Sequence, residues 1–305
     1  MTRRQKIKGQ LLRQFVRMMS PRHRRILAFR LMEESGVASI TFEREGLTWS
    51  ASAYELISWQ LFVEGGHHRE EMRALIAWLH RNGVLTSLRN VVIDAGANIG
   101  TTCITLAREA GCRALAIEPV DVNFSRLQTN VETNALSHRI ALAKKAIATK
   151  PGSLTMCITK GNSGSHFVVR DGNDFPEEKI AGYQRVEADT LSCIVAEAGF
   201  KSWEIALVWA DVQGCEMDVI ESGKPLWERG IPLWAEVEPV SLRRQGALST
   251  FASTAATHFD RFIDARSLVR VGDGAKPSPI TELPRLIQGI TPEQAAADIL
   301  LLPPA

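Results

Sequence analysis

Three carboxylates stand where this chain could bind a cation or accept a proton. Asp94, Glu118 and Asp211 each follow directly on a short apolar stretch of the kind that forms a buried strand. Ligands of open α/β sheets bind at the carboxyl ends of the strands, so we expect these three side chains to meet in one crevice. A carboxylate placed there can attract a cationic ligand, accept hydrogen bonds from hydroxyls or act as a general base.

A glycine-rich turn follows the first of these acids. The stretch before it is Val91-Val92-Ile93, three β-branched residues without polar alternation, which is typical of a parallel strand covered on both faces. Gly96 and Gly100 then permit a tight turn and a close approach of the backbone to a ligand. Apolar residues at helical spacing follow in 99–110. Strand, turn and helix together predict the first half of a nucleotide-binding βαβ unit.

The acids discriminate between the nucleotides that such a unit binds. A carboxylate at Asp94 would repel the pyrophosphate of NAD and attract the ammonium and sulfonium groups of S-adenosylmethionine. Glu118, at the end of the second strand, is placed to accept hydrogen bonds from two ribose hydroxyls. The alternative is a strand pair that binds no ligand. We expect S-adenosylmethionine as the cofactor, with contacts from Asp94, Gly96, Ala97, Asn98, Gly100, Thr101, Glu118, Pro119 and Ala146.

The rest of the chain supplies the elements that must position these residues. Ahead of the glycine turn we expect a hairpin in residues 37–50 and a helix in 71–81. We place the boundary between an N-terminal extension, 1–83, and the cofactor-binding domain, 84–305, after that helix. Beyond the turn we expect a helix at 242–256, a long loop at 160–182, and strands at 114–117, 139–148, 153–158, 184–188, 205–210, 233–238, 259–264 and 297–302.

Composition narrows the class of protein. At 305 residues the chain can bury a large core, and its net charge of +2 gives no signal for nucleic acid binding. No apolar run reaches the roughly 18 residues that a membrane-spanning helix needs, so none is expected. The five cysteines, an odd number without a C-x-x-C pair, are typical of reduced thiols in a cytoplasmic protein.

The N-terminal segment, residues 1–32, is strongly basic, with ten Lys or Arg and no Asp or Glu. Arg13 and Arg17 interrupt its apolar stretch, so a secretory signal is not expected. One interpretation is a basic amphipathic helix that contacts an anionic membrane or an acidic partner. The other is a helix that packs on the domain or on a second subunit of a homo-oligomer. Both rely on one apolar helical face, formed by Ile7, Leu11, Leu12, Phe15, Met18 and Met19.

Four blocks of the sequence resemble the FkbM-type S-adenosylmethionine-dependent methyltransferases. They are residues 93–100, Glu118-Pro119 with Asn130 and Asn134, residues 210–216, and residues 298–301. The resemblance extends from about residue 55 to the end of the chain. It implies a class I methyltransferase fold, which is a Rossmann-like, mostly parallel seven-stranded sheet with a reversed C-terminal hairpin. The chain departs from the family at residues 65–68, Gly-Gly-His-His, where an aromatic turn is common.

The resemblance also implies an activity, the methylation of hydroxyl oxygens on sugars, polyketides or other natural products. A hydroxyl acceptor has to lose its proton, which makes Asp211 and Glu216 the candidate catalytic residues, with His166 as a further candidate base. Asp211 could instead bind the N-terminal amides of the next helix. Glu236 and Glu238 could join Asp211 around a divalent metal ion, but no metal is predicted.

Two other functions remain open at this point. A methyltransferase fold could serve as a non-catalytic scaffold or binding protein, although the retained anchors Asp94, Gly96 and Glu118 oppose this. An NAD-dependent oxidoreductase is opposed by Asp94 and by the lack of a third spaced glycine.

Overall fold

The computed structural model describes residues 13–170 and 175–304, and the chain divides into two compact units between His67 and His68. The first unit contains the antiparallel hairpin that the sequence predicts near residues 37–50. Its elements are α2 (Pro21–Glu34), β1 (Ser39–Arg44), β2 (Leu47–Ser52), α3 (Leu56–Trp59) and the π-helical turn η1 (Gln60–Glu64).

Aromatic rings form the core of the first unit. Phe29 meets Trp59 edge-on with ring centroids 5.3 Å apart, and Phe42 meets Phe62 at 5.1 Å. Such pairs add about 0.5–1.5 kcal/mol beyond the burial of their area, which matters in a unit this small. Of the apolar face predicted for the N-terminal segment, Ile7, Leu11 and Leu12 lie outside the described residues.

The helix ahead of the glycine turn, α4 (Arg69–Arg81), belongs to the second unit. Its apolar side chains enter the core beneath the main sheet, and the indole N–H of Trp78 donates to the carbonyl of Ala275 (3.2 Å). The division into compact units lies at residues 67/68, and the predicted boundary of the cofactor-binding domain at 83/84 stays a prediction. The sequence pattern identifies the apolar face of a helix but not the sheet that covers it.

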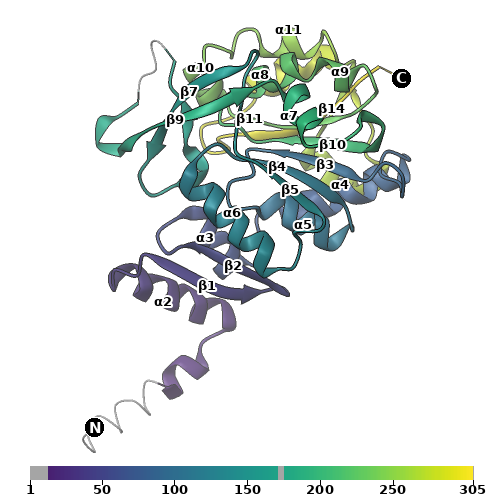
Figure 1. Cartoon of the computed structure of the whole chain (residues 1–305). Helices are drawn as coiled ribbons and strands as arrows, with labels where there is room; N and C mark the ends of the chain where they lie inside the picture. The colour runs from purple at the N-terminus through teal and green to yellow at the C-terminus, as the bar shows by residue number, and fades with distance from the viewer. Residues whose placement is uncertain (1–12, 171–174, 305) are drawn as a thin grey trace, which may run out of the picture. The chain divides into compact units, whose positions relative to one another are not determined.

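The second unit is built on a large sheet with the strand order β13-β12-β14-β11-β10-β3-β4-β5 (Figure 1). β14 runs antiparallel between β11 and β12, and the strands from β11 to β5 are parallel. The predicted α/β architecture with a large sheet is confirmed. The sheet has eight strands where seven are predicted, and the two-residue edge strand β13 is the difference. The strands are β3 (Val91–Ala95), β4 (Arg113–Ile117), β5 (Ile140–Ala143), β10 (Ile205–Ala210), β11 (Leu233–Val237), β12 (Arg261–Asp264), β13 (Ser278–Pro279) and β14 (Ala297–Leu302).

Helices cover both faces of this sheet. In Figure 1, α4, α5 (Thr101–Glu109) and α6 (Asp121–Thr133) lie on one side, and α7 (Leu191–Glu197), α8 (Glu216–Ser222), α9 (Lys224–Trp227) and α11 (Phe251–Ala255) lie on the other. Val91 and Ile93 enter the core shared with α7 and α8, while Val92 enters the core shared with α4 and α5. Burial on both faces explains why the central strands are apolar without alternation.

The predicted helix at 242–256 is two helices, α10 (Pro239–Arg244) and α11. Gly246, with a φ of 72°, ends the first of them in the left-handed conformation that glycine adopts freely. The remaining short elements are η4 (Ser202–Glu204), α12 (Ala265–Val271), η5 (Gly272–Gly274), η6 (Ile280–Glu282) and α13 (Leu283–Gln288). None of the helices in the described part of the chain combines the length and the apolar character needed to cross a membrane.

A second, four-stranded sheet has the order β6-β9-β7-β8. The predicted strand at 139–148 is divided, because β5 pairs with β4 while the following residues turn into this second sheet. The predicted loop at 160–182 also contains ordered elements. The elements of this region are β6 (Ala146–Ile147), β7 (Gly152–Thr159), η2 (Ser163–Ser165), β8 (Phe167–Val168), η3 (Glu177–Lys179) and β9 (Ile180–Asp189).

Candidate functional site

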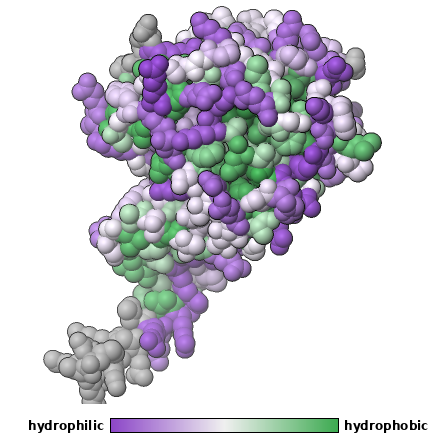
Figure 2. All heavy atoms as spheres, viewed as in Figure 1, coloured by the Kyte–Doolittle hydropathy of each residue, from purple (hydrophilic) through white to green (hydrophobic). Residues whose placement is uncertain are grey.

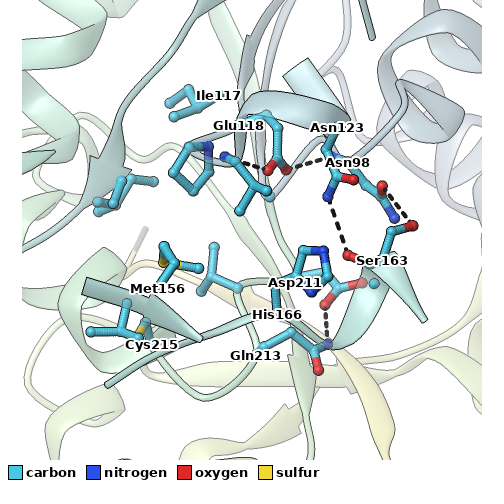
Figure 3. Close-up of a pocket in the computed structure, with 18 of the residues that line it drawn as sticks. Asn98, Ile117, Glu118, Asn123, Met156, Ser163, His166, Asp211, Gln213 and Cys215 are labelled. Carbon is cyan, nitrogen blue, oxygen red and sulfur yellow. Dashed lines mark hydrogen bonds between the residues drawn. The ribbon is translucent and has the colours of Figure 1, made fainter. Parts of the chain in front are cut away.

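A pocket opens where β3, β4 and β10 end at the same edge of the large sheet (Figure 3). It holds about 640 Å³ of space, part of it open to solvent. Gly96, Asn98, Glu118 and Asp211 line it, so the structure brings together residues from three of the predicted strand ends. The second sheet contributes the opposite wall through Met156, Val168 and the turn η2 between them.

Gly96 holds the glycine turn against the end of β10. Its φ of 86° lies in the left-handed region, and its N–H donates to the carbonyl of Ile117 (3.0 Å). A Cβ at this position would lie 1.8 Å from the carbonyl oxygen of Asp211. A residue without a side chain is therefore required where the turn passes Asp211.

Asp94 lies behind the turn and does not line the pocket. Its Oδ2 accepts a hydrogen bond from the backbone N–H of Cys103 (3.0 Å), which ties the end of β3 to the first turn of α5. Burial raises the pKa of Asp94 to about 7, against the opposing effect of that hydrogen bond. Asp94 therefore helps to hold the glycine turn in place. Its contact with a cofactor stays a prediction.

Glu118 lines the pocket and is held by the backbone on both sides. Its two carboxylate oxygens accept hydrogen bonds from the N–H groups of Asn98 and Val120, each at 2.9 Å. Burial raises the pKa of Glu118 to about 8, although these hydrogen bonds favour the ionised form. The carboxylate is therefore placed at a fixed point of the pocket wall before any ligand arrives.

Asn123, in the first turn of α6, is a site residue that sequence reasoning missed. It is 2% exposed and lines the pocket, and its Oδ1 has no hydrogen-bond partner among the residues that the structure describes. Its Nδ2 donates to the carbonyl of Ser163 (3.2 Å). Glu118 and Asn123 thus present two hydrogen-bond acceptors to the same part of the pocket, which suits the paired hydroxyls of a ribose.

The other predicted cofactor residues divide into two groups. Pro119 and Ala146 line the pocket. Ala97 donates its N–H to the carbonyl of Ile117 (3.0 Å), and Thr101 begins α5. Gly100 packs against Leu127, so that a Cβ would lie 2.8 Å from the Cδ1 atom of that leucine. These last three shape the turn from behind the pocket surface.

Asp211 lines the pocket beside a second carboxylate, that of Glu236. β10 and β11 run parallel with Ala210 beside Ala235, so the next residue in each strand places the two acids together. The amide of Gln213 donates to Asp211 Oδ1 (2.8 Å) and to Glu236 Oε2 (3.2 Å). The charge on Asp211, followed by burial, raises the pKa of Glu236 well above its ordinary value. A second negative charge beside Asp211 is therefore disfavoured at Glu236.

Asp298 extends this group onto the reversed strand β14. It is the register partner of Glu236, and its Oδ2 lies 3.6 Å from Nδ1 of His68. Burial raises the pKa of Asp298 to about 6, against the effect of His68. Among the residues described, no group of three or more His, Cys, Asp or Glu is arranged to hold a metal ion.

Glu216 does not line the pocket. It is 1% exposed at the start of α8, and its Oε1 accepts hydrogen bonds from the N–H groups of Val212 (3.2 Å) and Gly214 (3.3 Å). Burial raises the pKa of Glu216 to about 8. The carboxyl group holds the turn that follows Asp211, and its catalytic role stays a prediction without direct access to the pocket.

Part of the pocket wall opposite the large sheet comes from residues 160–182, the segment that the sequence predicts to be a long functional loop. Ser163 Oγ lies 3.4 Å from Asn98 Oδ1, so η2 is attached to the glycine turn. His166, directly after η2, lines the pocket and is 9% exposed. The richness of this stretch in Gly, Asn and Ser is the only signal in the sequence for this wall.

Comparison with known proteins identifies the family of this chain. The methyltransferase FkbM domain matches residues 94–265. No curated protein matches the sequence. Solved structures with a similar fold share so little sequence with this chain that they carry no information about its substrate.

P. horikoshii TYW2 in complex with MeSAdo shares 11% identity over 87% of this chain and 70% of its own, with a TM-score of 0.42. The human methyltransferase 10 domain containing protein shares 12% over 93% and 98%, with a TM-score of 0.42. The geranyl diphosphate C-methyltransferase from Streptomyces coelicolor A3(2) shares 8% over 75% and 74%, with a TM-score of 0.39.

Proposed function

Because the chain belongs to the FkbM methyltransferase family and its cofactor is S-adenosylmethionine, we propose that it methylates a hydroxyl oxygen of a small molecule, sugar or other natural product. The observation that carries this proposal is the carboxylate of Asp211 in the wall of the pocket that also holds Glu118 and the glycine turn. A hydroxyl oxygen, unlike a sulfur or an activated carbon acceptor, gains most from a carboxylate base at that point.

The residues present fit the cofactor. Asn123 Oδ1, buried and without a partner in the described chain, and the Glu118 carboxylate offer acceptors for the two ribose hydroxyls. Ile117, Val120 and Met156 provide an apolar lining suited to the adenine ring. When bound, S-adenosylmethionine supplies an electrophilic methyl group on a sulfonium.

Asp211 supports the transfer by receiving the proton of the acceptor. An Oδ atom of Asp211 would receive the hydroxyl proton while the acceptor oxygen takes up the methyl group that the cofactor would supply. A base in this position contributes about 10²–10⁴-fold. The rest of the acceleration comes from holding the acceptor in line with the methyl group.

Glu236 and Gln213 would keep Asp211 in place for this step. Gln213 donates to Asp211 Oδ1 at 2.8 Å and so fixes the orientation of that carboxylate. Asp211 and burial raise the pKa of Glu236, which disfavours a second negative charge beside the base. We assign Glu236 and Gln213 a positioning role, and we assign Glu216 the support of the turn that follows Asp211.

We further propose that the basic N-terminal segment contacts anionic membranes. Phe15 and Met18 are 61% and 86% exposed and stand next to the exposed basic residues Arg13 and Arg17. Figure 2 shows hydrophilic residues beside a smaller hydrophobic area at this end of the first unit. A truncated chain that starts at residue 21 should lose adsorption to phosphatidylserine vesicles. Equal adsorption of both chains would contradict the proposal.

The five free cysteines support a cytoplasmic location for the reaction. The methyl transfer itself is tested by incubating the protein with methyl-labelled S-adenosylmethionine and a panel of hydroxylated sugars and polyketides. Label in an ether-linked methyl group is the expected product. Label on nitrogen or carbon would refute the hydroxyl assignment, and cofactor binding without any transfer would favour the scaffold alternative.

A further inference from the structure

Three acids form a row across the ends of neighbouring strands of the large sheet. Asp211 follows β10 and lines the pocket, and Glu236 stands beside it in β11. Asp298 of β14 is the register partner of Glu236 and lines a separate cavity together with Glu71. Neighbouring strands lie about 4.8 Å apart, so the row extends over two strand spacings. The proposed reaction uses Asp211 as the base and leaves the combined charge of the row without a function.

All three acids belong to the same face of the sheet. Each acid is two residues away from a side chain that enters the core shared with α4, and these side chains are Trp209, Trp234 and Leu300. Side chains two residues apart along a strand lie on one face. Trp209 and Trp234 also stack, with ring centroids 4.7 Å apart, directly before the two acids nearest the pocket. The carboxyl groups are therefore concentrated at one place.

No cation of the described chain compensates the two acids nearest the pocket. Among the residues that the structure describes, neither Asp211 nor Glu236 forms an ion pair with a Lys, Arg or His. Their common contact is the neutral amide of Gln213, 2.8 Å from Asp211 Oδ1 and 3.2 Å from Glu236 Oε2. His68 lies 3.6 Å from Asp298, at the other end of the row. Buried carboxylates normally pair with a cation or keep a proton, so a cationic ligand would stabilise this row.

The other ionisable side chains of the pocket do not supply that cation in the structure. They are Glu118, Lys145, His166 and Cys215. The Nζ atom of Lys145 is surrounded by carboxylates, those of Glu197 at 2.6 Å, Glu187 at 3.2 Å and Asp189 at 3.4 Å. Burial raises the pKa of the Cys215 thiol, which keeps it neutral. The pocket therefore presents mainly negative charge to a ligand.

The pocket also shows an independent sign of a ligand. Asn123 is 2% exposed and lines it, and its Oδ1 has no hydrogen-bond partner within the described chain. Figure 3 shows Asn123 and Asp211 among the side chains that surround the same space. In-line transfer with Asp211 as the base would place the acceptor oxygen about 3 Å from both the carboxylate and the methyl carbon. The sulfonium would then lie within roughly 8 Å of Asp211.

We propose that the row of Asp211, Glu236 and Asp298 recognises the charge of the methyl donor. The pocket then binds S-adenosylmethionine, a sulfonium cation, in preference to S-adenosylhomocysteine, its neutral sulfide product, and this preference grows with pH. The inference rests on the proposed function for the position of the sulfonium. Two unit charges about 8 Å apart attract each other enough to change affinity by about 2- to 30-fold, for effective dielectric constants from about 80 to about 20. Loss of the positive charge in the reaction would favour release of the product.

The sign of the pH dependence follows from the protonation of the row. Asp211 and burial raise the pKa of Glu236, and burial raises that of Asp298 to about 6. As pH rises through these values the row gains negative charge, so its attraction for a cation should increase. The charged groups that act on Glu236 are Asp211, Asp298 and Glu216, and those that act on Asp298 are His68, Asp211 and Glu71.

Calorimetry on the full chain without a methyl acceptor tests the charge preference. The quantity measured is the ratio of the affinities for S-adenosylmethionine and S-adenosylhomocysteine. Asp211→Asn removes the charge nearest the pocket and should lower this ratio by about 2- to 30-fold, through weaker binding of the cation. Glu228→Gln, the same kind of change at an exposed acid of α9, is the matched control and should leave the ratio unchanged. An unchanged ratio in Asp211→Asn overturns the proposal.

The same ratio measured from about pH 5 to about pH 9 tests the other two acids. It should rise with pH in the wild type and rise less in Glu236→Gln and in Asp298→Asn. The amino group of each ligand titrates alike with every variant, so it does not affect this comparison. A wild-type ratio that is constant or falls with pH overturns the proposal, as does an equal rise in the wild type and both variants.

Glu236→Gln resembles a protonated glutamic acid in shape, so it keeps the test valid even if Asp211→Asn does not fold. Neither measurement needs the methyl acceptor. A failure of the charge preference is therefore distinguishable from a failure of the hydroxyl assignment, which only the labelled-transfer experiment can show.

Discussion

Asp211 and Glu236 stand side by side at the ends of two neighbouring parallel strands and accept hydrogen bonds from the same amide, that of Gln213. Two carboxylates this close do not both ionise readily, and the rise in the pKa of Glu236 expresses that conflict. Only Asp211 of the pair lines the pocket. The two carboxylates are therefore expected to respond differently to substitution.

The first prediction concerns Asp211. Asp211→Asn keeps the shape of the side chain but removes its capacity to take a proton, so turnover should fall on the order of 10²-fold or more. Affinity for S-adenosylhomocysteine should change little, because a loss confined to the rate is the mark of an interaction made in the transition state. Steady-state kinetics and calorimetry measure the two, with the exposed Asp260→Asn as control. A loss of cofactor affinity with normal turnover at saturation would make Asp211 a cofactor ligand instead.

The second prediction concerns Glu236. The charge on Asp211 and burial raise the pKa of Glu236, and glutamine resembles a protonated glutamic acid in shape and charge. At pH values below that raised pKa, Glu236→Gln should therefore keep turnover within a few-fold of the wild type. As pH rises through it, the wild type gains a second charge beside Asp211 and the variant does not, so the two pH–rate profiles should separate. A loss as large as that of Asp211→Asn at every pH would mean that Glu236 is itself the base.

The third prediction concerns Glu118 and the pH dependence of binding. Burial holds the pKa of Glu118 at about 8 in the free protein, and hydrogen bonds from ribose hydroxyls favour its ionised form. Binding therefore lowers this pKa and releases a proton, so affinity should fall as pH drops below about 8, by at most tenfold per pH unit. Calorimetry in buffers of different ionisation enthalpy measures the number of protons released on binding. The ligand should be 5′-methylthioadenosine, because it lacks the amino-acid end of the cofactor, whose amino group could also release a proton.

Glu118→Gln should abolish this proton release and weaken binding by about 1.5–3 kcal/mol, the range for a hydrogen bond to a charged group. Glu132→Gln, on the exposed face of the same helix as Asn123, should change neither. If proton release persists in Glu118→Gln, another group such as Asp94, whose pKa is also raised by burial, must supply the proton.

Much of the fold could be predicted because the local sequence pattern identifies the central strands. The strands at 205–210 and 297–302 match β10 and β14 residue for residue, since an apolar run between turn residues identifies a strand covered on both faces. The division of residues 139–148 between two sheets could not be predicted. Pairing partners are a tertiary property, and nothing in the local pattern separates β5 from β6.

The site was predicted where it depends on strand ends and missed where it depends on packing. Gly96, Glu118 and Asp211 line the pocket because the turn residues after a parallel strand point to that edge. Asn123 looks like any polar residue of a helix, and its role follows from burial alone. Glu216 is an acidic residue next to the turn after Asp211. Only the fold shows that its carboxyl group is buried and binds the backbone N–H groups of that turn.

The last prediction concerns Gly96, where the cofactor turn passes the strand that carries Asp211. In Gly96→Ala, the added Cβ would lie 1.8 Å from the carbonyl oxygen of Asp211. That oxygen belongs to the backbone, so it cannot move aside as easily as the end of a flexible side chain. The left-handed conformation adds about 1–2 kcal/mol for any residue with a Cβ. We expect the free energy of unfolding to fall by more than about 2 kcal/mol in urea denaturation. S-adenosylhomocysteine affinity should fall as well, because the turn must move away from β10.

Gly152→Ala is the matched control for this variant. Gly152 begins β7 without a left-handed φ, and a Cβ added there would have no atom within 4 Å, so the same change should leave stability and affinity near the wild type. If Gly96→Ala were as stable as Gly152→Ala and bound cofactor normally, the close approach of the turn to Asp211 would not be required. The coupling between the cofactor turn and the proposed base would then have to arise elsewhere in the pocket.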